Sequence, residues 1–291
     1  MEIFTAQLIN SIANGSIYAL LVTGFTLLLI VGGVVQFAFP HIVVMGMYLL
    51  WMVLQKTNNM IPLSIFAAIG GCIGMSLATE PLFRPLVRRG AGSQTFLVSL
   101  GISMIILDTM SRHINQGLPI SFPKELAGAE ALWRTGLVAI RTGQFLTIIG
   151  SVIAVVVFFF LLYRTRLGGA LRAMAQDILV AQLLGLPIRK NAILSFVLAG
   201  LLGGIAAIFL SMTFGAAWCT LPDNLAIKVV ASALLAGLGN LRGGLIGAYI
   251  LGLAEGMTLA YLPGDWAHAV AFGMIIIVVM IKPQGLFGVK T

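Results

Sequence analysis

The chain has 291 residues, of which 59% are hydrophobic and only 9% are charged, and its mean hydropathy is +1.06. Soluble domains carry roughly 25% charged residues, so this composition excludes an ordinary water-soluble protein and indicates an integral membrane protein. The net charge of +8 does not indicate nucleic-acid binding, because the 17 basic residues are spread over several loops without interleaved aromatic side chains.

Nine apolar stretches follow one another along the chain, and they predict helices because the alternation typical of membrane β-strands is absent. The second and seventh stretches are shorter than a bilayer-spanning helix, which is typical of re-entrant or interrupted segments. We therefore predict an all-α integral membrane protein, a polytopic helical bundle of eight or nine transmembrane segments in which residues 1–291 form a single transmembrane domain. The stretches cover residues 7–31, 42–54, 62–80, 95–111, 144–163, 191–211, 225–238, 244–261 and 266–282.

The first two stretches are joined by residues 31–42, with the sequence VGGVVQFAFPHI. Interrupted helices expose backbone groups and helix ends that can bind polar solutes, which makes Gln36 and His41 candidates for a translocation pathway. An ordinary loop at the membrane surface explains the same pattern equally well.

Positive charge predicts the orientation of the bundle. If all nine stretches cross the membrane and the amino terminus lies outside, eleven of the 17 basic residues fall on one side, which is therefore predicted to be cytoplasmic. On the other side, residues 111–142 form the longest connection, and they are expected to be an ordered external cap or a plain surface loop. Eight crossings with one re-entrant segment remain the alternative. The cytoplasmic segments are residues 84–94, 164–190, 240–244 and 282–291.

The cytoplasmic loop 164–190 contains a stretch that is too polar to cross a bilayer. After a glycine turn in YRTRLGG, the sequence LRAMAQDILVAQLL favours helix and lacks proline, so one short helix is predicted over 172–185, ended by Gly185 and Pro187. A helix that is apolar around most of its circumference fits a groove on another protein, although a connector packed on its own bundle is the alternative. The candidate docking residues are Arg172, Ala173, Gln176, Asp177, Leu183, Leu184 and Gly185.

Charged residues inside predicted spans need a partner, water or an interface. Lys228 either snorkels to the membrane surface or lines a cavity, and Glu255 is expected to pair with a basic group; both join Gln36 and His41 as pathway candidates. Because the chain has no Gly-Lys dipeptide, it has no phosphate-binding loop of the Walker A type, and no catalytic or metal-ligating set of residues is apparent.

Pairs of glycines at four-residue spacing predict close helix contacts, since small residues let helix backbones approach each other in lipid. The pairs are Gly70 and Gly74, Gly200 and Gly204, Gly243 and Gly247, and Gly252 and Gly256.

Several blocks resemble one known family. The run RAMAQDILVAQLLGLPIRKNAILSFVLAGLLGGIAAIFL (172–210) resembles the cytoplasmic loop and next helix of the permease subunits of ABC importers for branched-chain amino acids. The run NLAIKVVASALLAGLGNLRGGLIGAYILGLAEG (224–256) and the ending KPQGLFG (282–288) are similar to two later blocks of that family. Residues 15–49 also match, except that the family usually has Asn-Phe-Ala-His-Gly where this chain has QFAFPH at 36–41.

The resemblance covers most of the chain and implies a permease subunit of an ATP-binding cassette importer in the bacterial inner membrane. It implies docking of residues 172–185 on an ATPase, and it implies as partners two ATP-binding subunits, a second permease subunit, identical or homologous, and an extracytoplasmic solute-binding protein. The chain itself is then neither an enzyme nor the holder of a cofactor, because ATP and Mg belong to the ATPase subunits.

Two matters stay open. Related permeases import branched-chain amino acids, urea or short amides, so the expected cargo is a branched-chain amino acid or a related small polar solute. The intramembrane charges also permit an alternative, a stand-alone ion-coupled secondary transporter in which Asp108, Glu255 or Lys228 is the coupling group.

Overall fold

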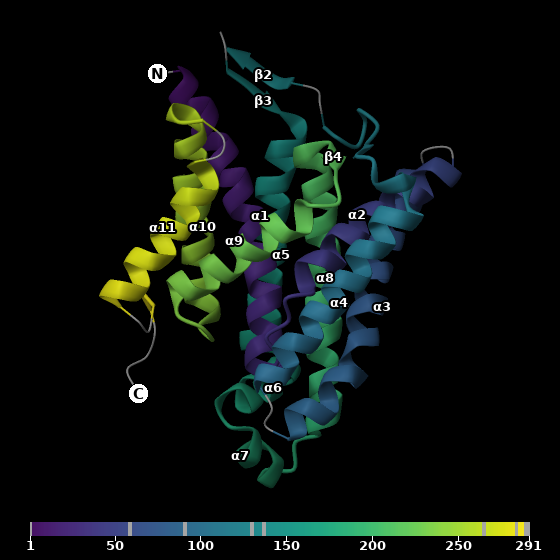
Figure 1. Ribbon diagram of the computed structural model, residues 1–291. Helices are drawn as coiled ribbons and strands as arrows, with labels where there is room; N and C mark the ends of the chain where they lie inside the picture. Colours follow the sequence, from purple (N-terminus) through teal and green to yellow (C-terminus); the bar gives the residue numbers. More distant parts are fainter. Residues whose placement is uncertain are drawn as a thin grey trace.

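The computed structural model describes residues 2–57, 60–89, 92–128, 131–135, 138–263, 266–282 and 285–287. These residues form a bundle of helices with two small antiparallel sheets (Figure 1). The helices are α1 (Glu2–Gly32), α2 (Phe39–Lys56), α3 (Ile61–Arg88), α4 (Gly92–His113), α5 (Thr142–Arg164), α6 (Arg166–Gln176), α7 (Ile178–Leu183), α8 (Ile188–Phe214), α9 (Leu221–Ala236), α10 (Leu241–Tyr261) and α11 (Trp266–Ile281). The short elements are the 3-10 helix η1 (Asn115–Gly117) and the strands β1 (Ile120–Ser121), β2 (Ala131–Thr135), β3 (Val138–Arg141) and β4 (Ala216–Ala217).

The predicted polytopic helical membrane fold is confirmed. Among the described residues, seven helices are long and apolar enough to cross a membrane: α1, α2, α3, α4, α5, α8 and α10. The predicted stretches 225–238 and 266–282 form α9 and α11, which have only 16 residues each. The second stretch is longer than predicted, because α2 begins at Phe39 and reaches 18 residues.

The centre of the bundle is α1, whose apolar residues surround the whole helix. A helix that is hydrophobic on every side is suited to burial, and nearly all of α1 from Ser11 to Leu28 is buried against its neighbours. It contacts α5, α8, α9 and α10. By contrast α3, α4 and α5 leave most of their surface uncovered by this chain, which suits helices that face lipid or a partner.

Three of the four predicted glycine pairs form close helix contacts. A Cβ built on Gly252 of α10 would lie 2.6 Å from the Cα of Gly15 in α1, and one on Gly204 of α8 would lie 2.7 Å from the Cα of Ile69 in α3. On Gly247, a Cβ would lie 2.5 Å from the carbonyl oxygen of Ser232. Gly70 and Gly74 differ, because neither has an atom within 4 Å of a built Cβ among the described residues.

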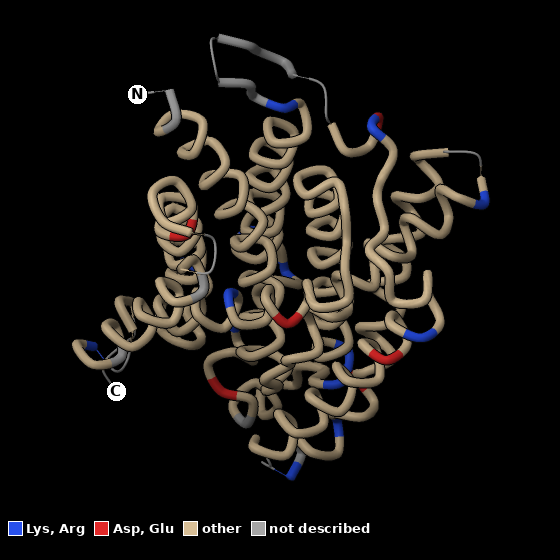
Figure 2. The backbone as a smooth tube through the Cα atoms, turned by 45° about the horizontal axis from the view of Figure 1, so that its top comes forward, with Lys and Arg blue, Asp and Glu red and all other residues tan. Residues whose placement is uncertain are grey.

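The two ends of the bundle carry different elements (Figure 1). At one end β2 and β3 pair as an antiparallel hairpin. At the same end β1 pairs antiparallel with β4, and this pairing joins the 111–142 connection to the segment that follows α8. At the other end lie α6 and α7, together with the ends of α3 and α5 and the starts of α8 and α10. The helix ends that carry the predicted cytoplasmic arginines therefore share the α6–α7 end, while most of the chain between the ends is uncharged (Figure 2).

Candidate functional site

The segment between α1 and α2 lies inside the protein. Val34, Gln36 and Ala38 are fully buried, and the backbone N–H of Phe37 donates a hydrogen bond to the Ser99 hydroxyl of α4 at 3.1 Å. Non-helical backbone at membrane depth is tolerated only where protein or a water-filled cavity satisfies its polar groups. The segment is therefore an interruption between two helices that lies buried inside the protein.

The first turns of α2 and α9 meet at a contact between two polar side chains. Each helix has proline at its second position, and the third position is His41 in α2 and Asp223 in α9. The His41 Nε2 and Asp223 Oδ1 atoms lie 3.1 Å apart, with His41 buried and the Asp223 side chain 54% exposed. Neither helix start has a side-chain cap; instead the first N–H groups, of Phe39 and Leu221, donate to the carbonyl oxygens of Gln36 and Trp218.

Gln36 lies beside the same junction. Its Nε2 donates a hydrogen bond to the Thr79 hydroxyl of α3 at 3.1 Å, and its Oε1 has no hydrogen-bond partner among the described residues. Gln36 also borders a small void with Pro40 of α2 and Val229 of α9. A buried amide oxygen without a partner is costly, so the arrangement is suited to a state in which another group occupies the junction.

A second polar cluster joins three helices in the interior. Lys228 Nζ of α9 lies 2.5 Å from Glu255 Oε1 of α10 and 3.0 Å from the Tyr18 hydroxyl of α1. The Tyr18 hydroxyl in turn donates to Glu255 Oε2 at 2.8 Å. All three side chains are buried, and each forms its hydrogen bonds or ion pair with the other two. The Lys228 side chain therefore does not extend to the surface.

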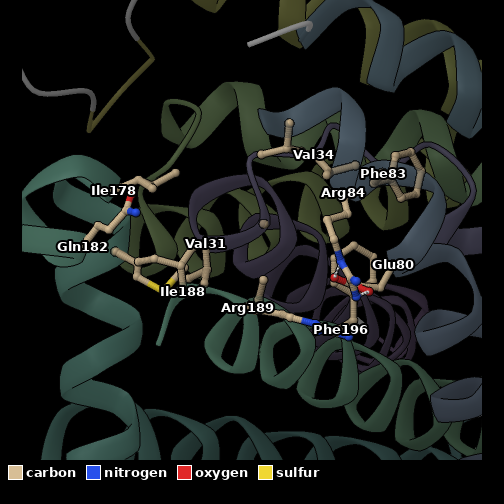
Figure 3. Close-up of a pocket in the computed structure, with 14 residues that line it drawn as sticks. Val31, Val34, Glu80, Phe83, Arg84, Ile178, Gln182, Ile188, Arg189 and Phe196 are labelled. Carbon is tan, nitrogen blue, oxygen red and sulfur yellow. Dashed lines mark hydrogen bonds and ion pairs between the residues drawn. The ribbon is translucent and has the colours of Figure 1, made fainter. Parts of the chain in front are cut away.

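A cavity of about 530 Å³ lies at the α6–α7 end of the bundle (Figure 3). One wall carries the ion pair of Glu80 and Arg84 on α3, in which Arg84 Nε donates to Glu80 Oε1 at 2.9 Å. The opposite wall carries Ile178 and Gln182 of α7 (Figure 3). On α3, Glu80 of the cavity wall directly follows Thr79, which accepts the hydrogen bond from Gln36. Helix α3 therefore connects the cavity beside α7 with the interrupted segment between α1 and α2.

The predicted single helix over 172–185 is wrong. The glycines at 168 and 169 are helical, because α6 begins at Arg166, where the Thr165 hydroxyl accepts a hydrogen bond from the Gly168 N–H. The helix ends at Gln176. Asp177 then has an extended backbone and its Oδ1 accepts a hydrogen bond from the Val180 N–H, which starts α7. Aspartate is a preferred residue at helix starts, and this local bond competes with continuation of α6.

The predicted docking residues are divided between α6 and the end of α7. Arg172, Ala173 and Gln176 belong to α6, and the Arg172 guanidinium turns toward the Tyr163 ring of α5. Leu183 and Leu184 are 87% and 73% exposed at the end of α7, and Gly185 has a positive φ that ends the turn.

Comparison with known proteins gives the family. The model of the family described as "Branched-chain amino acid transport system / permease component" matches residues 7–279. The chain belongs to this permease family. A high-affinity branched-chain amino acid transport system permease, BraD of Pseudomonas aeruginosa, is 27% identical, with 98% of this chain and 96% of that protein covered.

Other members of the permease family are similarly distant. The corresponding LivH permease of Escherichia coli K12 is 26% identical over 98% of this chain and 96% of its own length. A probable LivH permease from Methanocaldococcus jannaschii is 26% identical over 96% of this chain and 91% of its own length. This permease therefore matches such proteins along nearly their whole length.

Some residues of the junction and of the Lys228 cluster are not predicted from the sequence. Asp223, Thr79 and Tyr18 emerge only from the fold, although the Leu-Pro-Asp-Asn sequence at 221–224 is a recognisable helix start. Tyr18 and Thr79 lie within apolar stretches and carry no local signal.

Proposed function

We propose that this permease is the membrane-spanning subunit of an ATP-binding cassette importer in the bacterial inner membrane. Its cargo is a branched-chain amino acid or a related small polar solute. The assembly contains two ATP-binding subunits that hold ATP and Mg, a second permease subunit, and an extracytoplasmic solute-binding protein. The observation that carries this proposal is the projection of Leu183 and Leu184 from the end of the bundle, since an exposed apolar helix end fits a groove on a partner.

Movement of α7 provides a route from ATP to the junction. Ile178 and Gln182 form one wall of the 530 Å³ cavity, and the α3 ion pair forms the other, so displacement of α7 changes the support of α3. Thr79 of α3 holds Gln36 in the segment just before α2. A change at the ATP-binding subunits therefore reaches the contact between His41 and Asp223 through packed and hydrogen-bonded groups.

The junction of α2 and α9 suits a zwitterionic solute. The positive end of a helix dipole favours a carboxylate, and the half-exposed carboxylate of Asp223 favours an ammonium group. Opening the His41–Asp223 contact releases the Asp223 carboxylate for this role. In the closed arrangement His41 occupies the place that the ammonium group takes.

Replacing both Leu183 and Leu184 with glutamate tests the docking surface. Co-purification of the ATP-binding subunits is expected to fall about tenfold or more, because an unpaired carboxylate in an apolar groove costs more than about 1.4 kcal/mol. Leu118→Glu is the matched control, since Leu118 is also exposed but lies between η1 and β1, in the connection from α4 to α5. Undiminished co-purification of the double variant would refute the docking surface.

Asp223→Asn tests the solute site, since asparagine keeps the shape of the side chain and removes its charge. Uptake by the assembled transporter is expected to fall about tenfold or more, because a hydrogen bond to a charged group contributes about 1.5–3 kcal/mol. Asp108→Asn is the control, because its side chain is also 54% exposed but pairs with Arg112 on the surface of α4. Normal uptake by the Asp223 variant excludes this site, and loss of uptake in the Asp108 variant favours ion coupling.

A further inference from the structure

Two arginines from different helices share one aromatic ring at the α6–α7 end. The guanidinium of Arg172 in α6 lies 5.0 Å from the centroid of the Tyr163 ring in α5, and that of Arg242 in α10 lies 4.7 Å from it. Neither arginine forms an ion pair with a described residue. Each cation is attracted to the ring, but the two charges repel each other, so the arrangement favours an anion close to both guanidinium groups.

A cavity of about 910 Å³ opens beside this ring. Its accessible apolar wall is formed by the partly exposed Leu29 and Ile30 of α1 and the exposed Leu238 after α9. Its polar wall is formed by Arg172 and Gln176 of α6 and Asn240 before α10. No Asp or Glu lines it among the described residues. The cavity is therefore amphipathic, with positive charge at its polar side and no acidic side chain to neutralise that charge.

The position of the cavity along the helices matches the boundary between lipid tails and headgroups. Tyr163 lies in the last turn of the 23-residue α5, and Arg164 and Arg166 follow it. Aromatic and basic residues at the end of a spanning helix lie at headgroup level. Leu29 and Ile30, in the last turn of α1, extend the apolar wall from this level toward the hydrocarbon region.

We propose that this cavity binds the headgroup phosphate of an anionic phospholipid. The phosphate binds Arg172 on the cavity wall and the neighbouring Arg242, and an acyl chain covers Leu29, Ile30 and Leu238. A phosphate ion in solution would use the same arginines, but it has no group to cover the apolar wall. The bound lipid bridges α5, α6 and α10, so its presence stabilises the position of α6 next to α7. This inference rests on the proposed function, and it means that the lipid composition of the membrane influences transport.

Lipid binding is measured by native mass spectrometry of the purified full-length chain, without its partners, during titration with phosphatidylglycerol or phosphatidylcholine. The wild-type chain is expected to bind phosphatidylglycerol more tightly. The variant with both Arg172→Gln and Arg242→Gln is expected to bind it about 30-fold more weakly, since each basic side chain near the headgroups contributes about 1 kcal/mol. Because both arginines are exposed, the double variant should remain folded, which its thermal unfolding midpoint in detergent verifies.

The matched control replaces Arg164 and Arg166 with glutamine, which removes the same charge from the same end but leaves the cavity walls intact. Its affinity should change by less than about threefold, because Arg172 and Arg242, which lie over the Tyr163 ring, are both retained. Tyr163→Phe should retain the selectivity and Tyr163→Leu should reduce it, since the aromatic ring positions both arginines.

Three results would overturn the proposal: equal loss of affinity in both double variants, no preference for phosphatidylglycerol, or displacement of the lipid by inorganic phosphate at a comparable concentration. Because the assay uses neither ATP-binding subunits nor transport, failure of the proposed importer function leaves this result unaffected. If the Arg172 and Arg242 variant keeps its lipid affinity but loses the ATP-binding subunits, the arginines belong to a protein contact and the lipid site is refuted.

Discussion

Replacing Lys228 with methionine is expected to destabilise the bundle by about 3–5 kcal/mol, because it leaves the buried Glu255 carboxylate without its cation. The Tyr18 hydroxyl still donates to Glu255, but a neutral donor does not compensate a charge at membrane depth. The measurement is the thermal unfolding midpoint of the purified chain in detergent, together with the amount of folded protein recovered from membranes. Both should decrease strongly.

The double variant with methionine at both Lys228 and Glu255 separates charge from packing. Replacing a buried ion pair with apolar residues is often close to neutral, so this variant should recover most of the stability lost in the single variant. Lys190→Met is the control, because Lys190 is exposed at the start of α8. A Lys228 variant as stable as the Lys190 variant would mean that the Tyr18, Lys228 and Glu255 cluster does not support the fold.

Substituting Gly252 with valine should separate α1 from α10 and cost about 3 kcal/mol or more, since even a Cβ at this position lies 2.6 Å from the Gly15 backbone. Backbone atoms cannot move aside as a flexible side chain can, so the two helices must shift apart. The thermal unfolding midpoint in detergent measures the effect.

Gly70→Val is the matched control, since it introduces the same side chain into a spanning helix where nothing lies within 4 Å among the described residues. It is expected to change stability by less than about 0.5 kcal/mol, as surface substitutions usually do. Similar losses at Gly252 and Gly70 would show that helix propensity, rather than the α1–α10 contact, determines the effect.

The fold class follows from the sequence because membrane helices are long, apolar and local. The positions of nine apolar stretches need no knowledge of tertiary contacts, and seven of them form helices of spanning length. Boundaries are less predictable. Gly168 and Gly169 suggest a turn, but the Thr165 cap upstream starts α6 before them, and the Asp177 bond then divides the stretch that propensity alone predicts as one helix.

The candidate site is only partly predictable for a different reason. The interrupted segment with Gln36 and His41 carries its own local signal in glycine and proline, and a charge inside a span indicates that Glu255 needs a cation. Which residues face these groups depends on how distant helices pack. Asp223 lies 182 positions from His41, and Lys228 lies 27 positions from Glu255, so their pairing requires the three-dimensional structure.

The most direct test of the importer function is uptake into liposomes that contain the chain with or without the ATP-binding subunits encoded by neighbouring genes. Leucine, urea and short amides are supplied with the solute-binding protein, and ATP is supplied to the ATPase side. We expect uptake of one of these solutes only when the ATP-binding subunits and ATP are both present. Uptake by the chain alone that follows an ion gradient, with no response to ATP, would contradict the proposed function.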